Sequence, residues 1–137
     1  MPTFRKTPFG EENGRRTVNN LFGFRDFNYC SFDNFLYEHG IQLILKLHPM
    51  EESLVIGELR EKNLRCISLL TGQRLEEAGV ELYETLNAAD LLITDYSLVY
   101  FDYLLLDRPI IYLPVDLEEY TQTRGLLLEP YDAWTPG

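Results

Sequence analysis

The sequence has little of what metal sites, disulfide scaffolds and membrane spans require. Its 137 residues include two cysteines and two histidines, and their spacing matches no metal-ligand pattern. We therefore expect Cys30 and Cys66 to be reduced cysteines in a cytosolic protein, and we expect no metal ion. No apolar run approaches the roughly 20 residues of a membrane-spanning helix. The N-terminus holds Arg5 and Lys6 without the apolar segment of a signal peptide.

Positive charge is also scarce. The formal net charge is −10, which excludes a broad basic face and with it nucleic acid as an expected partner. Basic side chains gather in residues 1–25, where five of them stand against two acidic ones. An acidic protein that binds an anionic ligand must rely on a few local cations and backbone N–H groups.

Apolar runs alternate with amphipathic stretches along the chain, and this alternation predicts an α/β domain. Residues 6–28, rich in Gly, Asn and Arg, predict a long mobile loop. Strands alternating with helices imply a doubly wound parallel sheet with helices on both faces. The predicted strands are the end of a strand at 1–4, then 41–47, 64–70, 91–94 and 109–113; the predicted helices are 31–39, 51–61, 80–89, 97–106 and 116–122.

One junction follows the apolar run at residues 91–94. The run ends in Asp95, Tyr96 and Ser97, and a helical pattern starts directly afterwards. Free backbone N–H groups and the positive end of a helix dipole suit a phosphate at such a junction. Asp95 and Ser97 are either helix caps or ligand contacts. Because any α/β protein contains junctions of this shape, the pattern alone does not identify a ligand.

A second junction ends the predicted strand 41–47. Pro49 stops the strand and suits the first turn of a helix, which leaves Lys46 and His48 at the carboxyl end. Residues at i and i+2 share one side of a strand, and open α/β sheets bind ligands at this edge. Lys46 and His48 thus predict an anion site, although His48 could also be a structural residue at the strand end. His39 precedes Gly40 at a helix end and is expected to be structural.

Six segments, in order, resemble the C-terminal half of the CDP-glycerol glycerophosphotransferase family, whose enzymes build teichoic-acid-like polymers. The resemblance extends from Pro2 to Gly137, nearly the whole chain. Each segment is short, but six in this order are specific. The segments are Pro2–Arg5, Lys46–Pro49, Ile93–Ser97, Asp102–Pro109, Asp116–Tyr120 and Arg124-Gly125.

The resemblance implies a Rossmann-like domain over residues 1–137 that binds a nucleotide donor and forms one half of a GT-B-like architecture. It implies transfer of glycerol phosphate, or another alditol phosphate, from a CDP-linked donor to a hydroxyl of a cell-envelope polymer or glycolipid. The family carries a catalytic His in a Trp-His-Gly segment of its first half, and that segment has no counterpart here. We therefore expect a fragment of a two-domain enzyme, inactive alone, which needs no cofactor. The full-length enzyme, including the N-terminal domain that this chain lacks, would be a cytoplasmic protein bound peripherally to the inner face of a bacterial cell membrane.

The resemblance also assigns the donor site. His48 is the expected catalytic group, which meets the charge on the leaving phosphate. For three of the expected contacts an alternative stays open, because Arg5, Asp102 and Arg124 could be solvated surface residues. Leu98 stands where the family usually has a second serine, which removes one hydroxyl from the site. The expected donor contacts are Thr3, Arg5, Lys46, His48, Asp95, Tyr96, Ser97, Asp102 and Arg124.

Two other functions compete with this one. A GT-B glycosyltransferase using a nucleotide sugar would present a similar cleft. A signalling receiver domain would also place a phosphoacceptor where Asp95 ends a strand. However, a receiver needs an acidic pair at an early strand end and a lysine at a late one, and neither is apparent.

Overall fold

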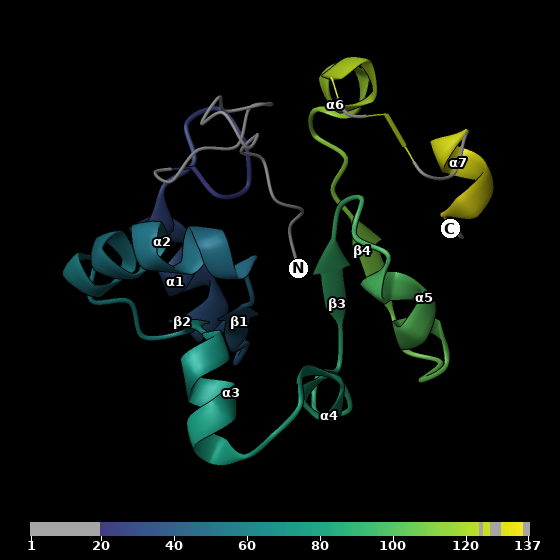
Figure 1. Cartoon of the computed structure of the whole chain (residues 1–137). Helices are drawn as coiled ribbons and strands as arrows, with labels where there is room; N and C mark the ends of the chain where they lie inside the picture. The colour runs from purple at the N-terminus through teal and green to yellow at the C-terminus, as the bar shows by residue number, and fades with distance from the viewer. Residues whose placement is uncertain (1–19, 124, 127–129, 136–137) are drawn as a thin grey trace.

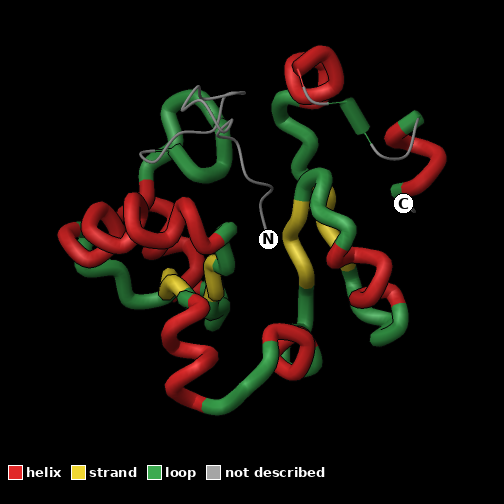
Figure 2. Tube along the Cα trace, in the orientation of Figure 1, coloured by secondary structure: helices red, strands yellow, loops and turns green. Residues whose placement is uncertain are grey.

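The computed structural model describes residues 20–123, 125–126 and 130–135, within which helices and short strands alternate (Figure 1). Figure 2 shows the strands as short segments among longer helices and loops. The helices are α1 (Tyr29–Glu38), α2 (Pro49–Glu61), α3 (Gly72–Ala78), α4 (Leu82–Leu86), α5 (Val99–Leu104), α6 (Leu117–Thr123) and α7 (Tyr131–Trp134). The strands are β1 (Leu43–Leu45), β2 (Ile67–Leu69), β3 (Leu92–Thr94) and β4 (Ile110–Tyr112).

The strands pair in parallel, as the alternation of elements predicts. β1 pairs with β2, with Leu43 opposite Ile67, and β3 pairs with β4, with Leu92 opposite Ile110. Helix α2 connects the first pair and α5 the second, which is how parallel neighbours must be joined. The α/β class is therefore confirmed. Within the described residues the pairs form two separate two-stranded sheets rather than one continuous sheet.

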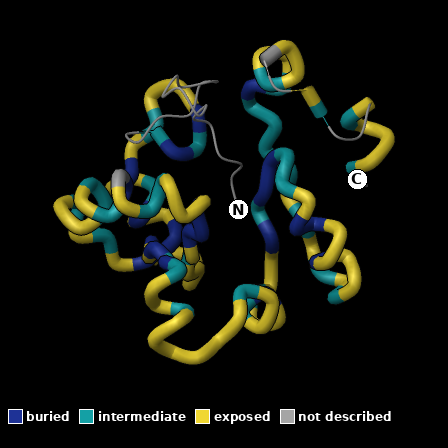
Figure 3. The backbone as a smooth tube through the Cα atoms, in the orientation of Figure 1, coloured by how far each residue is buried: buried dark blue, intermediate teal, exposed yellow. Residues whose placement is uncertain are grey.

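Each strand pair has its own hydrophobic cluster (Figure 3). The first cluster joins β1 and β2 to α1 and α2, and Leu47 and Val55 are almost fully buried in it. The second cluster joins β3 to α5 around Tyr103, which has no exposed surface. The Tyr103 hydroxyl donates to the carbonyl of Ala89 at 2.7 Å, so its polar end is satisfied. The two ligand-binding junctions predicted from the sequence thus belong to different clusters.

Only the last part of the predicted loop 6–28 is described. In residues 20–28, Leu21 is buried and Phe22 and Phe27 pack against the first cluster. The Phe22 and Phe27 ring centroids are 4.8 Å apart, and the Tyr29 hydroxyl accepts the Leu21 N–H. Residues 6–19 lie outside the described part, and mobility of the loop stays a prediction.

Two helices were not predicted from the sequence. The Thr71 hydroxyl caps α3 by accepting the Arg74 N–H, and Gly79 ends this helix with φ of 63°. Helix α7 follows Pro130. Helix α1 begins two residues earlier than expected, because the Asn28 side chain caps it through the Ser31 N–H.

Candidate functional site

His48 caps the N-terminus of α2, directly after the segment that follows β1. The Met50 N–H donates to Nδ1 of His48 at 3.3 Å, and the His48 carbonyl accepts the N–H groups of Glu51 and Glu52. Pro49 occupies the first helical position, where its missing N–H costs nothing. The imidazole is exposed. It is therefore oriented by the backbone of the helix while its ring faces the surface.

Lys46 is buried and paired with an acidic side chain. Its Nζ lies 2.6 Å from Oε1 of Glu52 and 2.8 Å from the Leu47 carbonyl oxygen. The Glu52 carboxylate also accepts the N–H of Gly72 at 3.0 Å. The pair therefore ties the start of α2 to the start of α3. Lys46 is buried whereas His48 is exposed. Because β1 ends at Leu45, the two-residue alternation of a strand does not extend to these two residues.

The junction after β3 is held by its own side chains. Asp95 is buried, and its Oδ1 accepts the Tyr96 N–H at 2.7 Å. Ser97 is partly buried and does not cap α5. The N-cap is Leu98, which has no side chain able to cap. The geometry thus leaves Ser97 beside the helix start without a capping role.

Tyr96 links this junction to α6. Its hydroxyl donates to Oδ1 of Asp116 at 2.9 Å, and its ring stacks on Tyr120 with centroids 4.2 Å apart. Asp116 is 4% exposed. The sequence analysis placed both residues in the segment Asp116–Tyr120 that carries the family resemblance, but gave neither a role at the site. Their four-residue spacing, which puts both on one side of a helix start, was the available signal.

Helix α7 contacts the same junction. The Tyr131 hydroxyl donates to the Asp95 carbonyl oxygen at 3.0 Å, and the Tyr100 hydroxyl donates to the Trp134 carbonyl oxygen at 2.9 Å. Burial, followed by the charge of Asp95, raises the pKa of the Tyr131 phenol. The phenol therefore stays protonated and remains a donor over the whole physiological range.

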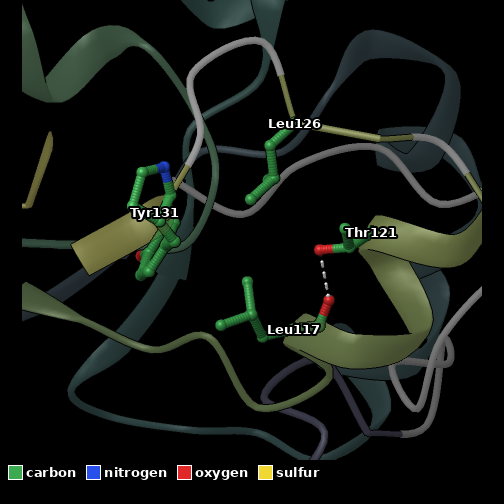
Figure 4. Close-up of a pocket in the computed structure, with 5 residues that line it drawn as sticks. Leu117, Thr121, Leu126 and Tyr131 are labelled. Carbon is green, nitrogen blue, oxygen red and sulfur yellow. Dashed lines mark hydrogen bonds between the residues drawn. The ribbon is translucent and has the colours of Figure 1, made fainter. Parts of the chain in front are cut away.

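A hollow of about 490 Å³ lies beside Tyr131, between α6 and α7 (Figure 4). The Thr121 hydroxyl in it donates to the Leu117 carbonyl at 2.8 Å, so the polar atom is already used within α6. Its described lining is mainly apolar and consists of Leu117, Thr121, Leu126, Pro130 and Tyr131.

The remaining predicted contacts lie elsewhere. Asp102 is exposed on α5 and approaches Tyr83 of α4. The charge of Asp102 and its hydrogen bond with the Tyr83 phenol raise the pKa of that phenol. Thr3, Arg5 and Arg124 lie outside the described residues. In the described part of the chain, no group of three or more acidic, His or Cys side chains could hold a metal ion. The helices described there include none long and apolar enough to cross a membrane.

Comparison with known proteins gives a match along the whole chain. The model of a family described as CDP-Glycerol:Poly(glycerophosphate) glycerophosphotransferase matches residues 1–137. The chain is 36% identical over 113 residues to a teichoic acid glycerol-phosphate primase of Bacillus spizizenii, covering 76% of this chain and 27% of that protein. It is 33% identical over 122 residues to the primase of the same name from Bacillus subtilis, covering 83% and 29%.

A third relative carries a different alditol in its name. The chain is 29% identical over 140 residues to the teichoic acid ribitol-phosphate polymerase TarK of Staphylococcus aureus, covering 99% of this chain and 23% of the polymerase. The chain thus spans less than a third of the length of these relatives. No solved structure matches it.

Proposed function

Because the chain belongs to the CDP-glycerol:poly(glycerophosphate) glycerophosphotransferase family, we propose that it forms the donor-binding part of a CDP-alditol phosphotransferase. The enzyme transfers glycerol phosphate, or a related alditol phosphate, to a hydroxyl of a cell-envelope polymer or glycolipid, and CMP leaves. The names of the relatives include both glycerol phosphate and ribitol phosphate. Both alditols are therefore candidate donors. We place the enzyme at the cytoplasmic face of the membrane, as a peripheral protein together with an N-terminal domain.

The proposed architecture is one half of a GT-B-like enzyme, with a Rossmann-like sheet. When the strands of a Rossmann sheet are numbered along the chain, their spatial order is 3-2-1-4-5-6. The first strand therefore lies between two neighbouring pairs, the second with the third and the fourth with the fifth. The two parallel pairs, β1 with β2 and β3 with β4, fit these positions. The central strand would then precede β1 in the chain. The strand end predicted at residues 1–4, outside the described part, is the candidate.

His48 carries the proposed chemistry. Its Nδ1 accepts the Met50 N–H, so in the neutral ring the proton resides on Nε2. That N–H can donate to the oxygen of the phosphate on which negative charge develops as CMP leaves. The helix holds the ring in place before the donor binds, and such preorganisation is what makes a donor group effective in the transition state.

Lys46 and Ser97 contribute less directly than His48. Lys46 is neutralised by Glu52 in this structure, so its first effect on the site is to hold the His48–Pro49 turn against α3. Ser97 offers a hydroxyl and a backbone N–H at the second junction.

The acceptor hydroxyl must lie in line with the bond that breaks. The general base that activates it comes from the part of the enzyme outside residues 1–137.

The test separates the role of His48 as a helix cap from its role in the reaction. In the full-length enzyme, His48→Asn keeps a side-chain oxygen for the Met50 N–H but removes Nε2–H. We expect both His48→Asn and His48→Ala to lower the rate about 100–1,000-fold, with only the alanine variant losing stability. His39→Ala is the matched control, because the His39 ring lies against the end of its own helix, with Nδ1 2.8 Å from the Phe35 carbonyl oxygen. A folded His48→Asn enzyme with the wild-type rate would exclude the role of Nε2.

The signalling alternative fits the site poorly. The Asp95 side chain is buried, and its carboxylate already accepts the Tyr96 N–H. A phosphoacceptor must be open to an incoming phosphoryl group, whereas Asp95 is only 5% exposed. A nucleotide-sugar donor remains the competing enzyme function, and a panel of donors decides between the two.

A further inference from the structure

We infer that Asp116 is a positioning residue of the donor site: its carboxylate fixes Tyr96 and, through Tyr96, holds Ser97 at the start of α5. This inference rests on the proposed function, because it assigns a purpose to the geometry of the second junction. Asp116 lies directly before α6. It acts through the Tyr96 hydroxyl, 2.9 Å from its Oδ1.

Asp116 directly precedes α6, and its carbonyl accepts the Tyr120 N–H, but its burial sets it apart from the other acids at this helix start. Its neighbours Glu118 and Glu119 complement the dipole of α6 from exposed positions, as surface acids do. Asp116 is 4% exposed, and a buried carboxylate is costly unless hydrogen bonds satisfy it. The bond that crosses to Tyr96, 20 residues earlier in the chain, is one of these.

Tyr96 is restrained from three directions. Asp116 holds its hydroxyl, Tyr120 stacks on its ring at 21°, and Tyr131 meets the same ring edge-on at 71°. Its backbone N–H is held by the Asp95 carboxylate, whereas the Asp95 carbonyl is held by the Tyr131 hydroxyl. The Asp95–Tyr96 peptide, just before Ser97, is therefore held by the Asp95 carboxylate and by Tyr131 of α7, while Asp116 and Tyr120 hold the Tyr96 side chain.

The restraint on Tyr96 matters because no capping side chain of α5 fixes the start of that helix. A capping side chain usually fixes the entry of the chain into a helix, and at α5 the N-cap is Leu98, which makes no such bond. The Tyr96–Asp116 bond takes the place of that local constraint. If it is lost, the Asp95–Ser97 turn gains freedom, and the Ser97 hydroxyl and N–H must be ordered each time the donor binds.

The test compares four variants of the full-length enzyme: Tyr96→Phe, Asp116→Ala, Asp116→Asn and the exposed control Glu118→Ala. Loss of one buried hydrogen bond corresponds to about tenfold in affinity. We therefore expect Tyr96→Phe and Asp116→Ala to raise KM for the CDP-alditol donor about tenfold, with KM for the acceptor unchanged. Asp116→Asn keeps an oxygen for the Tyr96 hydroxyl and should restore most of the affinity. The double variant Tyr96→Phe/Asp116→Ala should be no worse than either single variant.

Amide hydrogen exchange without donor gives an independent readout. Exchange over residues 95–98 should become faster in Asp116→Ala and stay unchanged in Glu118→Ala, at equal melting temperature. Unchanged exchange, or an unchanged donor KM in Asp116→Ala, would overturn the inference. An Asp116→Asn enzyme as impaired as Asp116→Ala would also overturn it, because the carboxylate charge would then act on the ligand itself. If the wild-type enzyme turns over no CDP-alditol, the proposed function fails, whereas the exchange data still decide whether Asp116 holds the junction.

Discussion

Replacing Lys46 by methionine should destabilise the fold far more than an ordinary surface substitution. The Lys46 and Glu52 side chains are only 10% and 12% exposed, and their charged atoms are 2.6 Å apart. Methionine fills the space of the lysine stem but leaves the Glu52 carboxylate without its cation. Removing one partner of a buried ion pair costs about 3–5 kcal/mol, and the residual exposure places the expected loss near the lower end, about 3 kcal/mol.

The partner substitution completes a double-mutant cycle. Glu52→Gln keeps an oxygen for the Gly72 N–H and removes only the charge, so we expect a loss of about 2 kcal/mol. In Lys46→Met/Glu52→Gln no unpaired charge is buried. Its loss should therefore be well below the sum of the single losses, with a coupling energy of about 2–3 kcal/mol.

The assay is urea unfolding of the 137-residue chain at pH 7, followed by circular dichroism. Lys62→Met is the matched control, because Lys62 lies 4.0 Å from Glu58 and both side chains are a third or more exposed. Exposed pairs of this kind contribute about 0.5 kcal/mol or less. If Lys46→Met costs no more than Lys62→Met, the pair is not a structural one, and Lys46 is available to a ligand.

Three further predictions concern acid stability, the helix start and the isolated chain. Hydrogen bonds from the Cys66 N–H, and then the N–H and charge of Arg65, lower the pKa of the Asp33 carboxyl below its ordinary value of 3.8. The ionised carboxylate therefore stabilises the fold above that value, and this stability is lost as pH falls through the folded pKa. Asp33→Asn should therefore flatten the acid limb of a melting-temperature titration, and an unchanged limb would refute this. Leu98→Ser adds a hydroxyl at the start of α5, where the family usually has a second serine, and should leave donor affinity in calorimetry equal or tighter; weaker binding would count against the donor site. The purified 137-residue chain should turn over no CDP-glycerol above its His48→Ala control in a CMP-release assay.

The sequence predicted the strands because their signal is local. Each of the four strands lies inside an apolar run of 4 to 8 residues, bounded by polar or turn residues. The apolar runs are longer than the strands. In the first run, Lys46 and Leu47 lie beyond the end of β1, and Lys46 contacts Glu52 of α2. Helix α3 was missed because Leu75 and Ala78 are the only apolar residues in its short sequence, too few for a helical period, although Thr71 before it is a good N-cap.

The site was less predictable, since its contacts join distant residues. The sequence placed His48 and Ser97 directly after strands, and in the structure each lies three residues beyond the strand end, at the start of the next helix. It could not show that Glu52 turns back onto Lys46, or that Asp116 reaches Tyr96 across 20 residues. Such pairs depend on how the helices pack, which no local pattern encodes.

The most direct measurement of the central claim is donor binding by calorimetry to the full-length protein. The panel holds CDP-glycerol, CDP-ribitol, a UDP-sugar and CMP, each titrated into wild type and the Glu118→Ala control. Our account predicts that one CDP-alditol binds at least tenfold tighter than CMP, because the second phosphate and the alditol add contacts, and that the UDP-sugar binds no better than CMP. Tighter binding of the UDP-sugar than of either CDP-alditol would contradict the account and favour a glycosyltransferase.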